Sequence, residues 1–138
     1  MAESSESMST VLFVDDEKRI LSTLKRLLFG EPFNVLIADS AAAALEILET
    51  TSVDIIVSDE RMPGMRGSDL LTEVKRLYPD ICRIMLTGHA SLEASISAIN
   101  SGRIFRFLLK PVTKKDLLEA LHQGLDERFQ YNRLLSLS

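Results

Sequence analysis

Residues 53–67 read VDIIVSDERMPGMRG, and this stretch determines how the rest of the chain is interpreted. Ile55, Ile56 and Val57 form an apolar, β-branched run too short for a helix, which predicts a buried strand of a parallel sheet. The strand ends on a carboxylate, Asp59, just before a Pro-Gly loop. Open α/β sheets place their chemistry at the carboxyl ends of their strands, so Asp59 is either a site residue or an ordinary turn-forming aspartate.

Similar apolar runs recur along the chain and alternate with segments of helical periodicity. The predicted strands are residues 10–14, 33–38, 53–58, 81–86 and 104–109. Strands that alternate with helices form a parallel sheet covered on both faces. The sequence therefore predicts an α/β fold, a (βα)5 doubly wound parallel five-stranded sheet of order 2-1-3-4-5, which is the flavodoxin-like order.

Apolar stripes and capping residues mark the helices between these strands. Ser40 and Thr113 are the expected N-caps of the second and the last helix. Leu92, Ile96 and Ile99 mark the fourth helix, which Ser91 would cap and Gly102 would end. The apolar stripe of the last helix consists of Leu117, Leu118, Leu121, Leu125 and Phe129. This helix has no clear end, so we predict a domain over residues 10–128 and a helical extension over 129–138, a connector or dimer seam unless it frays.

Composition limits the classes of function that remain. The chain has 138 residues, a net charge of −4 and one cysteine, Cys82. A single cysteine excludes an internal disulfide, and the negative net charge gives no indication of a basic surface for nucleic acid. It has no apolar run of the ~18 residues that a membrane span needs. Residues 1–9 lack the features of a secretory signal and are predicted to be a disordered lead, so we expect a cytoplasmic protein without membrane association.

Polar side chains follow three further strands of the predicted sheet. Asp15 and Asp16 end the first strand, Thr87 follows the fourth and Lys110 follows the fifth. The carboxyl ends of parallel strands share one edge, so these groups would meet Asp59 there. Three crowded carboxylates repel one another unless a cation neutralises them, and Mg²⁺ suits a site with few carboxylates. With a hydroxyl and an ammonium group added, the set predicts a site for phosphoryl transfer to Asp59.

Four motifs resemble those of the receiver domains of two-component response regulators. They are VDDE at 14–17, SDERMPGM at 58–65, MLTGH at 85–89 and FLLKP at 107–111, and the resemblance spans residues 10 to 128. It implies that Asp59 is the phosphoacceptor for a sensor histidine kinase or histidine phosphotransfer protein, in a domain that is not a turnover enzyme. It also implies Mg²⁺ ligation by Asp16, Asp59 and the backbone carbonyl of Arg61, with Asp15 acting through water.

The same resemblance implies a switch and two positions that tune the lifetime of the phosphoryl group. Thr87 would move toward the phosphoryl group and Phe107 would turn inward behind it, changing the surface of the fourth helix, the strand 104–109 and the last helix. That surface would control an output domain or partner, or join two copies of the chain. Arg61 would shield the acyl phosphate and His89 would orient water. The simpler interpretations are that Phe107 is a static core aromatic and that His89 is a solvated surface side chain.

Residues 99–111 are similar to a receiver subgroup often joined to HD-type phosphohydrolase domains or kinase modules. Val112 departs from that subgroup, which commonly has Trp there, and no effector motif is present in this chain. The chain is therefore either the N-terminal part of a longer regulator or a stand-alone receiver.

Three other functions compete with this interpretation. A haloacid dehalogenase-type phosphohydrolase needs Asp-x-Asp after the first strand, and a flavodoxin-type carrier needs a Ser/Thr/Gly-rich loop where this chain has three acids. A degenerate receiver that acts as a phosphorylation-independent binding module remains the main alternative. Incubation with Mg²⁺ and a small phosphodonor separates it from a phosphoacceptor.

Overall fold

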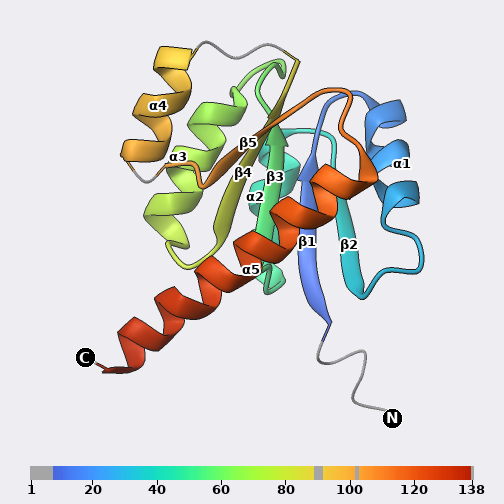
Figure 1. The fold of residues 1–138 in the computed structure, drawn as a ribbon. Coiled ribbons are helices and arrows are strands. Elements are labelled where there is room, and N and C mark those ends of the chain that lie inside the picture. Colours follow the sequence, from blue (N-terminus) through green and yellow to red (C-terminus); the bar gives the residue numbers. More distant parts are fainter. Residues whose placement is uncertain (1–7, 89–91, 102, 138) are drawn as a thin grey trace.

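A computed structural model describes residues 8–88, 92–101 and 103–137. Five parallel strands form one sheet of order β2-β1-β3-β4-β5, as the sequence predicts (Figure 1). The strands are β1 (Ser9–Val14), β2 (Phe33–Ala38), β3 (Ile55–Asp59), β4 (Cys82–Thr87) and β5 (Arg106–Leu109). The helices are α1 (Lys18–Leu27), α2 (Ala41–Thr50), α3 (Gly67–Leu77), α4 (Leu92–Asn100) and α5 (Lys114–Leu137).

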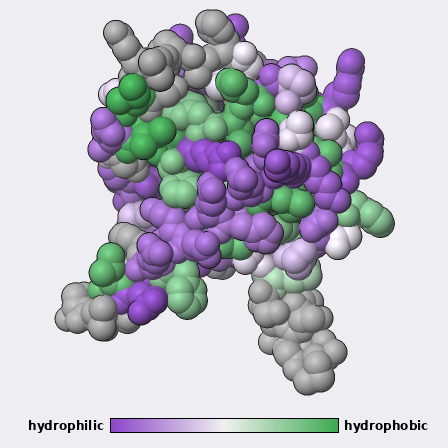
Figure 2. Space-filling view, viewed as in Figure 1, coloured by the Kyte–Doolittle hydropathy of each residue, from purple (hydrophilic) through white to green (hydrophobic). Residues whose placement is uncertain are grey.

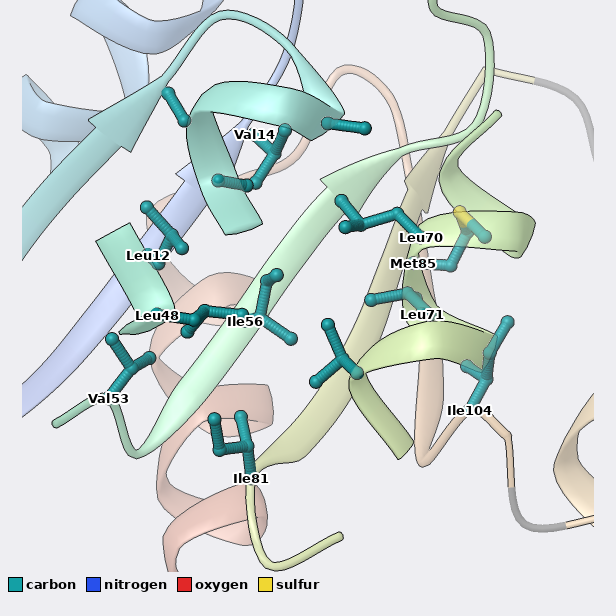
Figure 3. Packing of buried hydrophobic residues seen from close by; sticks show 14 of the residues in the cluster. Leu12, Val14, Leu48, Val53, Ile56, Leu70, Leu71, Ile81, Met85 and Ile104 are labelled. Atoms are coloured by element: carbon teal, nitrogen blue, oxygen red, sulfur yellow. The ribbon is translucent and has the colours of Figure 1, made fainter. Parts of the chain in front are cut away.

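The helices bury the sheet from both sides. Successive strand residues point to opposite faces, so Leu12 and Ile56 pack against α2 and α3, while Phe13 packs against α1 and α5. Figure 3 shows the first of these layers, in which Leu70 and Leu71 of α3 lie beside the central strands. All five residues of β3 are buried, which explains the apolar run at its start. The last of them, Asp59, is therefore a buried carboxylate at the carboxyl end of the strand.

Local sequence signals account for most of the element ends. The Ser40 hydroxyl accepts a hydrogen bond from the Ala43 N–H at 3.1 Å, and the Thr113 hydroxyl accepts one from the Asp116 N–H at 3.1 Å, so both predicted N-caps are confirmed. Gly30 follows α1 with φ of 83°, a conformation that glycine adopts without strain. The strand boundaries differ from the predicted ones by no more than two residues, and β1 begins at Ser9, inside the predicted lead.

Two predicted apolar stripes are wrong in part. In α4, Ile96 and Ile99 are 49% and 45% exposed, and Ala98 is the buried side chain among residues 96–100. In α5, Phe129 is 67% exposed because the helix has passed the sheet at that point. Periodicity identifies an apolar face, but it does not say whether the domain itself covers that face. The expected caps at 91 and 102 lie outside the described residues.

Helix α5 crosses one face of the sheet at very short range. A Cβ added to Gly124 would lie 3.0 Å from the Cys82 Sγ, so the glycine permits this approach. Cys82 is the first residue of β4 and is buried, and burial raises the pKa of its thiol to about 12. It therefore packs as a small apolar side chain rather than as a reactive thiol.

An ion-pair cluster marks the point where α5 leaves the sheet. Arg128 contacts the carboxylates of Asp54 at 2.8 Å and Asp80 at 3.2 Å, and Asp54 also accepts the Thr10 N–H at 2.7 Å. Beyond Arg128 the helix continues away from the domain to Leu137 (Figure 1). Among the described residues, no helix is both long and apolar enough to cross a bilayer.

Candidate functional site

The register of the strands brings three carboxylates together at one edge of the sheet. Val14 of β1 pairs with Ser58 of β3, so the residues that follow, Asp15 and Asp59, lie next to each other. Asp15, Asp16 and Asp59 each offer one oxygen atom, and these three atoms lie within 4.8 Å of one another. Asp15 is 1% and Asp59 is 6% exposed, whereas Asp16 faces solvent. The predicted acidic cluster is therefore present, with one member open to incoming ligands.

Lys110 reaches this cluster from the end of β5. Its Nζ lies 2.8 Å from Oδ1 of Asp59 and 3.1 Å from Oδ2 of Asp15. The Lys110 N–H donates to the Thr87 carbonyl at 2.9 Å, which fixes the lysine backbone against the end of β4. One ammonium group thus bridges two buried carboxylates that would otherwise repel each other.

The electrostatics of the cluster favour the arrival of a further cation. Burial raises the pKa of the Asp59 carboxyl, the charges of Asp15 and Asp16 add to this, and the hydrogen bond from Lys110 opposes it without cancelling it. For Lys110 burial lowers the pKa, but the hydrogen bonds and charges of the two carboxylates outweigh it, so the net pKa is raised. Three carboxylates facing one lysine leave negative charge in the cluster, which suits a hard divalent cation with oxygen ligands.

The backbone after β1 orients the acidic pair. The Glu17 N–H donates to Oδ1 of Asp15 at 2.9 Å, and the Asp15 N–H donates to the Ala38 carbonyl of β2 at 3.1 Å. Asp15 therefore uses one oxygen to hold the turn before α1 and the other to hold Lys110. This leaves Asp16 as the acid of the pair that faces solvent.

The structure describes three of the four remaining predicted residues, and these three lie at or near the same edge. Thr87 is the last residue of β4 and is 5% exposed. Phe107 pairs with Met85 in the sheet and is half-buried against the core cluster between the sheet and α2 and α3. Arg61 is exposed in the loop after β3, and His89 lies outside the described residues.

Sequence reasoning missed two residues that shape the loop after Asp59. Glu60 binds Ser68 at the start of α3 with both carboxylate oxygens. Gly67 packs against the backbone of Asp59 so closely that an added Cβ would lie 2.0 Å from the Asp59 carbonyl oxygen. The Asp-Glu pair and the later glycine are visible in the sequence, but nothing local indicates that they meet across six intervening residues.

A basic stripe on α1 begins beside the acidic cluster. Lys18, Arg19, Lys25 and Arg26 are exposed, the helix contains no acidic residue, and none of the four forms an ion pair with another described residue. The surface over α1, at the right of Figure 2, is mostly hydrophilic. Phe29, directly after the helix, is 87% exposed. A cationic surface therefore lies next to an anionic site, although the net charge of the chain is negative.

The fold and the edge of strand-end acids, threonine and lysine are those of a receiver domain. The family model described as "Response regulator receiver domain" matches residues 11–122, and the chain belongs to this family. The hydrogenase transcriptional regulatory protein HoxA of Cupriavidus necator is 37% identical over 122 residues, which are 88% of this chain and 25% of that protein. The chain spans about a quarter of the length of the curated relatives it matches.

Two solved structures are similar over nearly the whole chain. The crystal structure of an uncharacterized protein from Neptuniibacter caesariensis has 43% sequence identity and a TM-score of 0.82, covering 90% of this chain and 92% of that one. The signal receiver domain of an HD domain-containing protein from Pseudomonas fluorescens Pf-5 has 36% identity and a TM-score of 0.83, covering 89% and 98%. These similarities confirm the predicted fold and family.

Proposed function

We propose that this receiver domain accepts a phosphoryl group on Asp59 and loses it again, and so switches a partner or an output domain. The observation that carries the proposal is the bridge from Lys110 to Asp59 and Asp15, with Asp16 within reach of both acids. A buried carboxylate held beside a lysine and a divalent-cation site is placed to act as a nucleophile toward phosphorus.

We propose Mg²⁺ as the cation, held by Asp16, Asp59 and the backbone carbonyl of Arg61, with Asp15 acting through water. The fit follows from the donor set, which consists of hard oxygen atoms with net negative charge and one solvent-facing acid. Bound Mg²⁺ would neutralise charge on the phosphoryl oxygens and on the acids that surround them.

The chain's own residues account for the transfer step. One Asp59 carboxylate oxygen attacks phosphorus, and the bond from phosphorus to the donor's histidine nitrogen breaks, with the electron pair leaving on the imidazole. Lys110 already lies 2.8 Å from Asp59 and can move its contact to a phosphoryl oxygen as negative charge arrives there. Thr87, at the neighbouring strand end, supplies a hydroxyl to another phosphoryl oxygen. The product is an acyl phosphate that water later cleaves to the free carboxylate and inorganic phosphate.

Two side chains would set how long this acyl phosphate lasts. Arg61 lies two residues after the phosphoacceptor, and its long cationic side chain would shield the phosphorus or pair with a phosphoryl oxygen. His89 is the second such position, and its placement lies outside the described residues. Arg61→Ala should therefore dephosphorylate faster, and an unchanged or slower rate would count against the role of Arg61.

We propose that the switch passes from Thr87 to Phe107. When Thr87 moves toward the phosphoryl group it vacates space, and the half-buried Phe107 on the adjacent strand can fill it by packing alone. The surface formed by α4, β5 and α5 changes as a result, and it would contact an output domain or a second copy of the chain. Residues 129–138 would connect the domain, residues 10–128, to that output.

The output domain is proposed from the relatives. The receiver from Pseudomonas fluorescens is part of an HD domain-containing protein, which supports an HD-type output, whereas HoxA is a transcriptional regulator. The phosphodonor would be a sensor histidine kinase or a histidine phosphotransfer protein. The basic stripe of α1 lies next to the site, and it would attract an acidic surface on that donor.

Phosphorylation by acetyl phosphate tests the proposed function without a partner protein. The wild type should gain one phosphoryl group in the presence of Mg²⁺, measured by intact mass, and should gain none when a chelator removes the metal. Asp59→Asn should gain none, whereas Asp54→Asn, at the opposite end of β3, should behave as the wild type. A wild type that takes no phosphoryl group under any condition would support the phosphorylation-independent binding module instead.

A further inference from the structure

We infer that Glu60 is a positioning residue, whose carboxylate fixes the loop that presents the Arg61 carbonyl to Mg²⁺. The inference rests on the proposed function, because it concerns the same metal site. Glu60 follows the phosphoacceptor directly and is half-buried. Glutamates are seldom buried unless their carboxylates are paired, so the partners of Glu60 indicate its role.

Glu60 replaces the N-cap that α3 lacks. The N-cap residue of α3, Arg66, makes no side-chain capping hydrogen bond. Instead, Oε1 of Glu60 accepts the Ser68 N–H at 2.8 Å and Oε2 accepts the Ser68 hydroxyl at 3.2 Å. A carboxylate at this place satisfies a free N–H and lies at the positive end of the helix dipole. The first turn of α3 is therefore capped by the residue that directly follows β3, eight positions before Ser68 in the chain.

The backbone of the same residue closes the loop a second time. The Glu60 carbonyl accepts the Gly67 N–H at 3.0 Å, so Glu60 binds two consecutive residues of α3 through three hydrogen bonds. Gly67 also packs directly on the Asp59 carbonyl, where a side chain would not fit. The loop 61–66 is therefore held at both ends by short contacts, and its first member is Arg61.

Fixing this loop has a direct consequence for the metal. A backbone carbonyl is a useful ligand only if it is held in place before the ion arrives, because ordering a free loop on binding consumes free energy. Residues that orient metal ligands without touching the ion typically change metal affinity by 10-fold or more when they are removed. We therefore expect the contacts of Glu60 with Ser68 to strengthen Mg²⁺ binding by about 10-fold.

Two conservative variants separate positioning from simple charge. Glu60→Gln loses the negative charge but keeps the length, and it can still accept from the Ser68 N–H and donate to the Ser68 hydroxyl. Glu60→Asp keeps the charge but is one methylene shorter, so it no longer reaches both groups of Ser68. Positioning predicts that Gln behaves as the wild type and Asp does not, whereas attraction of the ion by charge predicts the reverse.

The measurement is Mg²⁺ binding to the unphosphorylated chain by isothermal titration calorimetry, with Glu73→Ala on the exposed side of α3 as the control for helix charge. Glu60→Asp should bind Mg²⁺ about 10-fold more weakly than the wild type, and Glu60→Gln and Glu73→Ala should stay within about 2-fold. At saturating Mg²⁺, Glu60→Asp should recover the wild-type rate of phosphorylation by acetyl phosphate.

Other outcomes overturn the inference and can be told apart. If Glu60→Asp and the wild type bind Mg²⁺ with equal affinity, Glu60 has no positioning role. If Glu60→Gln binds Mg²⁺ weakly and Glu60→Asp binds it with wild-type affinity, the effect belongs to charge. Either result leaves the proposed function intact if the wild type binds Mg²⁺ and is phosphorylated. A wild type that does neither overturns both the proposed function and this inference.

Discussion

Replacing Gly67 with alanine should damage both the stability of the domain and its phosphoryl transfer. The added Cβ would lie 2.0 Å from the Asp59 carbonyl oxygen, whereas real Cβ atoms essentially never come closer than 3.0 Å. The difference, 3.0 − 2.0 Å, means that α3 or the end of β3 must shift by at least about 1 Å. Strain of this kind in a packed interior costs about 1–3 kcal/mol of unfolding free energy.

The same shift moves the phosphoacceptor relative to Lys110 and the acids. A misplacement of about 1 Å can slow a reaction by about 100-fold. Phosphorylation of Gly67→Ala by acetyl phosphate should therefore slow by at least about 10-fold. Urea unfolding and phosphorylation kinetics measure the two effects. Gly88→Ala is the matched control, because a Cβ there meets nothing within 4 Å, and its stability should change by less than about 0.5 kcal/mol. A Gly67→Ala protein as stable as the control would refute this reasoning.

Three further perturbations test other parts of the structure. Since burial raises the pKa of Asp59, its ionised form opposes folding. In urea unfolding without Mg²⁺, Asp59→Asn should therefore be more stable than the wild type at pH 7, and the difference should disappear as the pH falls below the pKa of an ordinary aspartate. Arg128→Leu strands two carboxylates and should lose about 1–2 kcal/mol in urea unfolding. Reversing the charges of Lys25 and Arg26 should slow transfer from a protein donor, most strongly at low salt, and leave acetyl phosphate transfer unchanged.

The sheet and the acidic cluster could be predicted because each depends on a short signal. A β-branched run followed by a carboxylate identifies a strand end, and the parallel topology brings Asp15 and Asp59 to one edge. Lys110 and Thr87 were found by the same logic, one strand end at a time. The order of the strands then determines which ends are neighbours, and the predicted order is the observed one.

The parts that could not be predicted depend on contacts that no local pattern records. The caps of α3 come from Glu60 across a loop, and the need for Gly67 comes from a backbone that only the folded chain brings near. The exposure of Ile96 and Phe129 was missed for a different reason. An apolar face looks the same in the sequence whether it meets the core of its own domain or is left at the surface, as both of these are.

The central claim is that Asp59 is the one carboxylate of this cluster that takes the phosphoryl group. Borohydride reduction of the phosphorylated chain, followed by peptide mass analysis, locates the acyl phosphate because it converts the modified aspartate to homoserine. Homoserine should appear in place of Asp59, and only after incubation with Mg²⁺ and phosphodonor. Homoserine in place of Asp15 or Asp16, or in place of Asp59 when the metal is removed, would contradict the account.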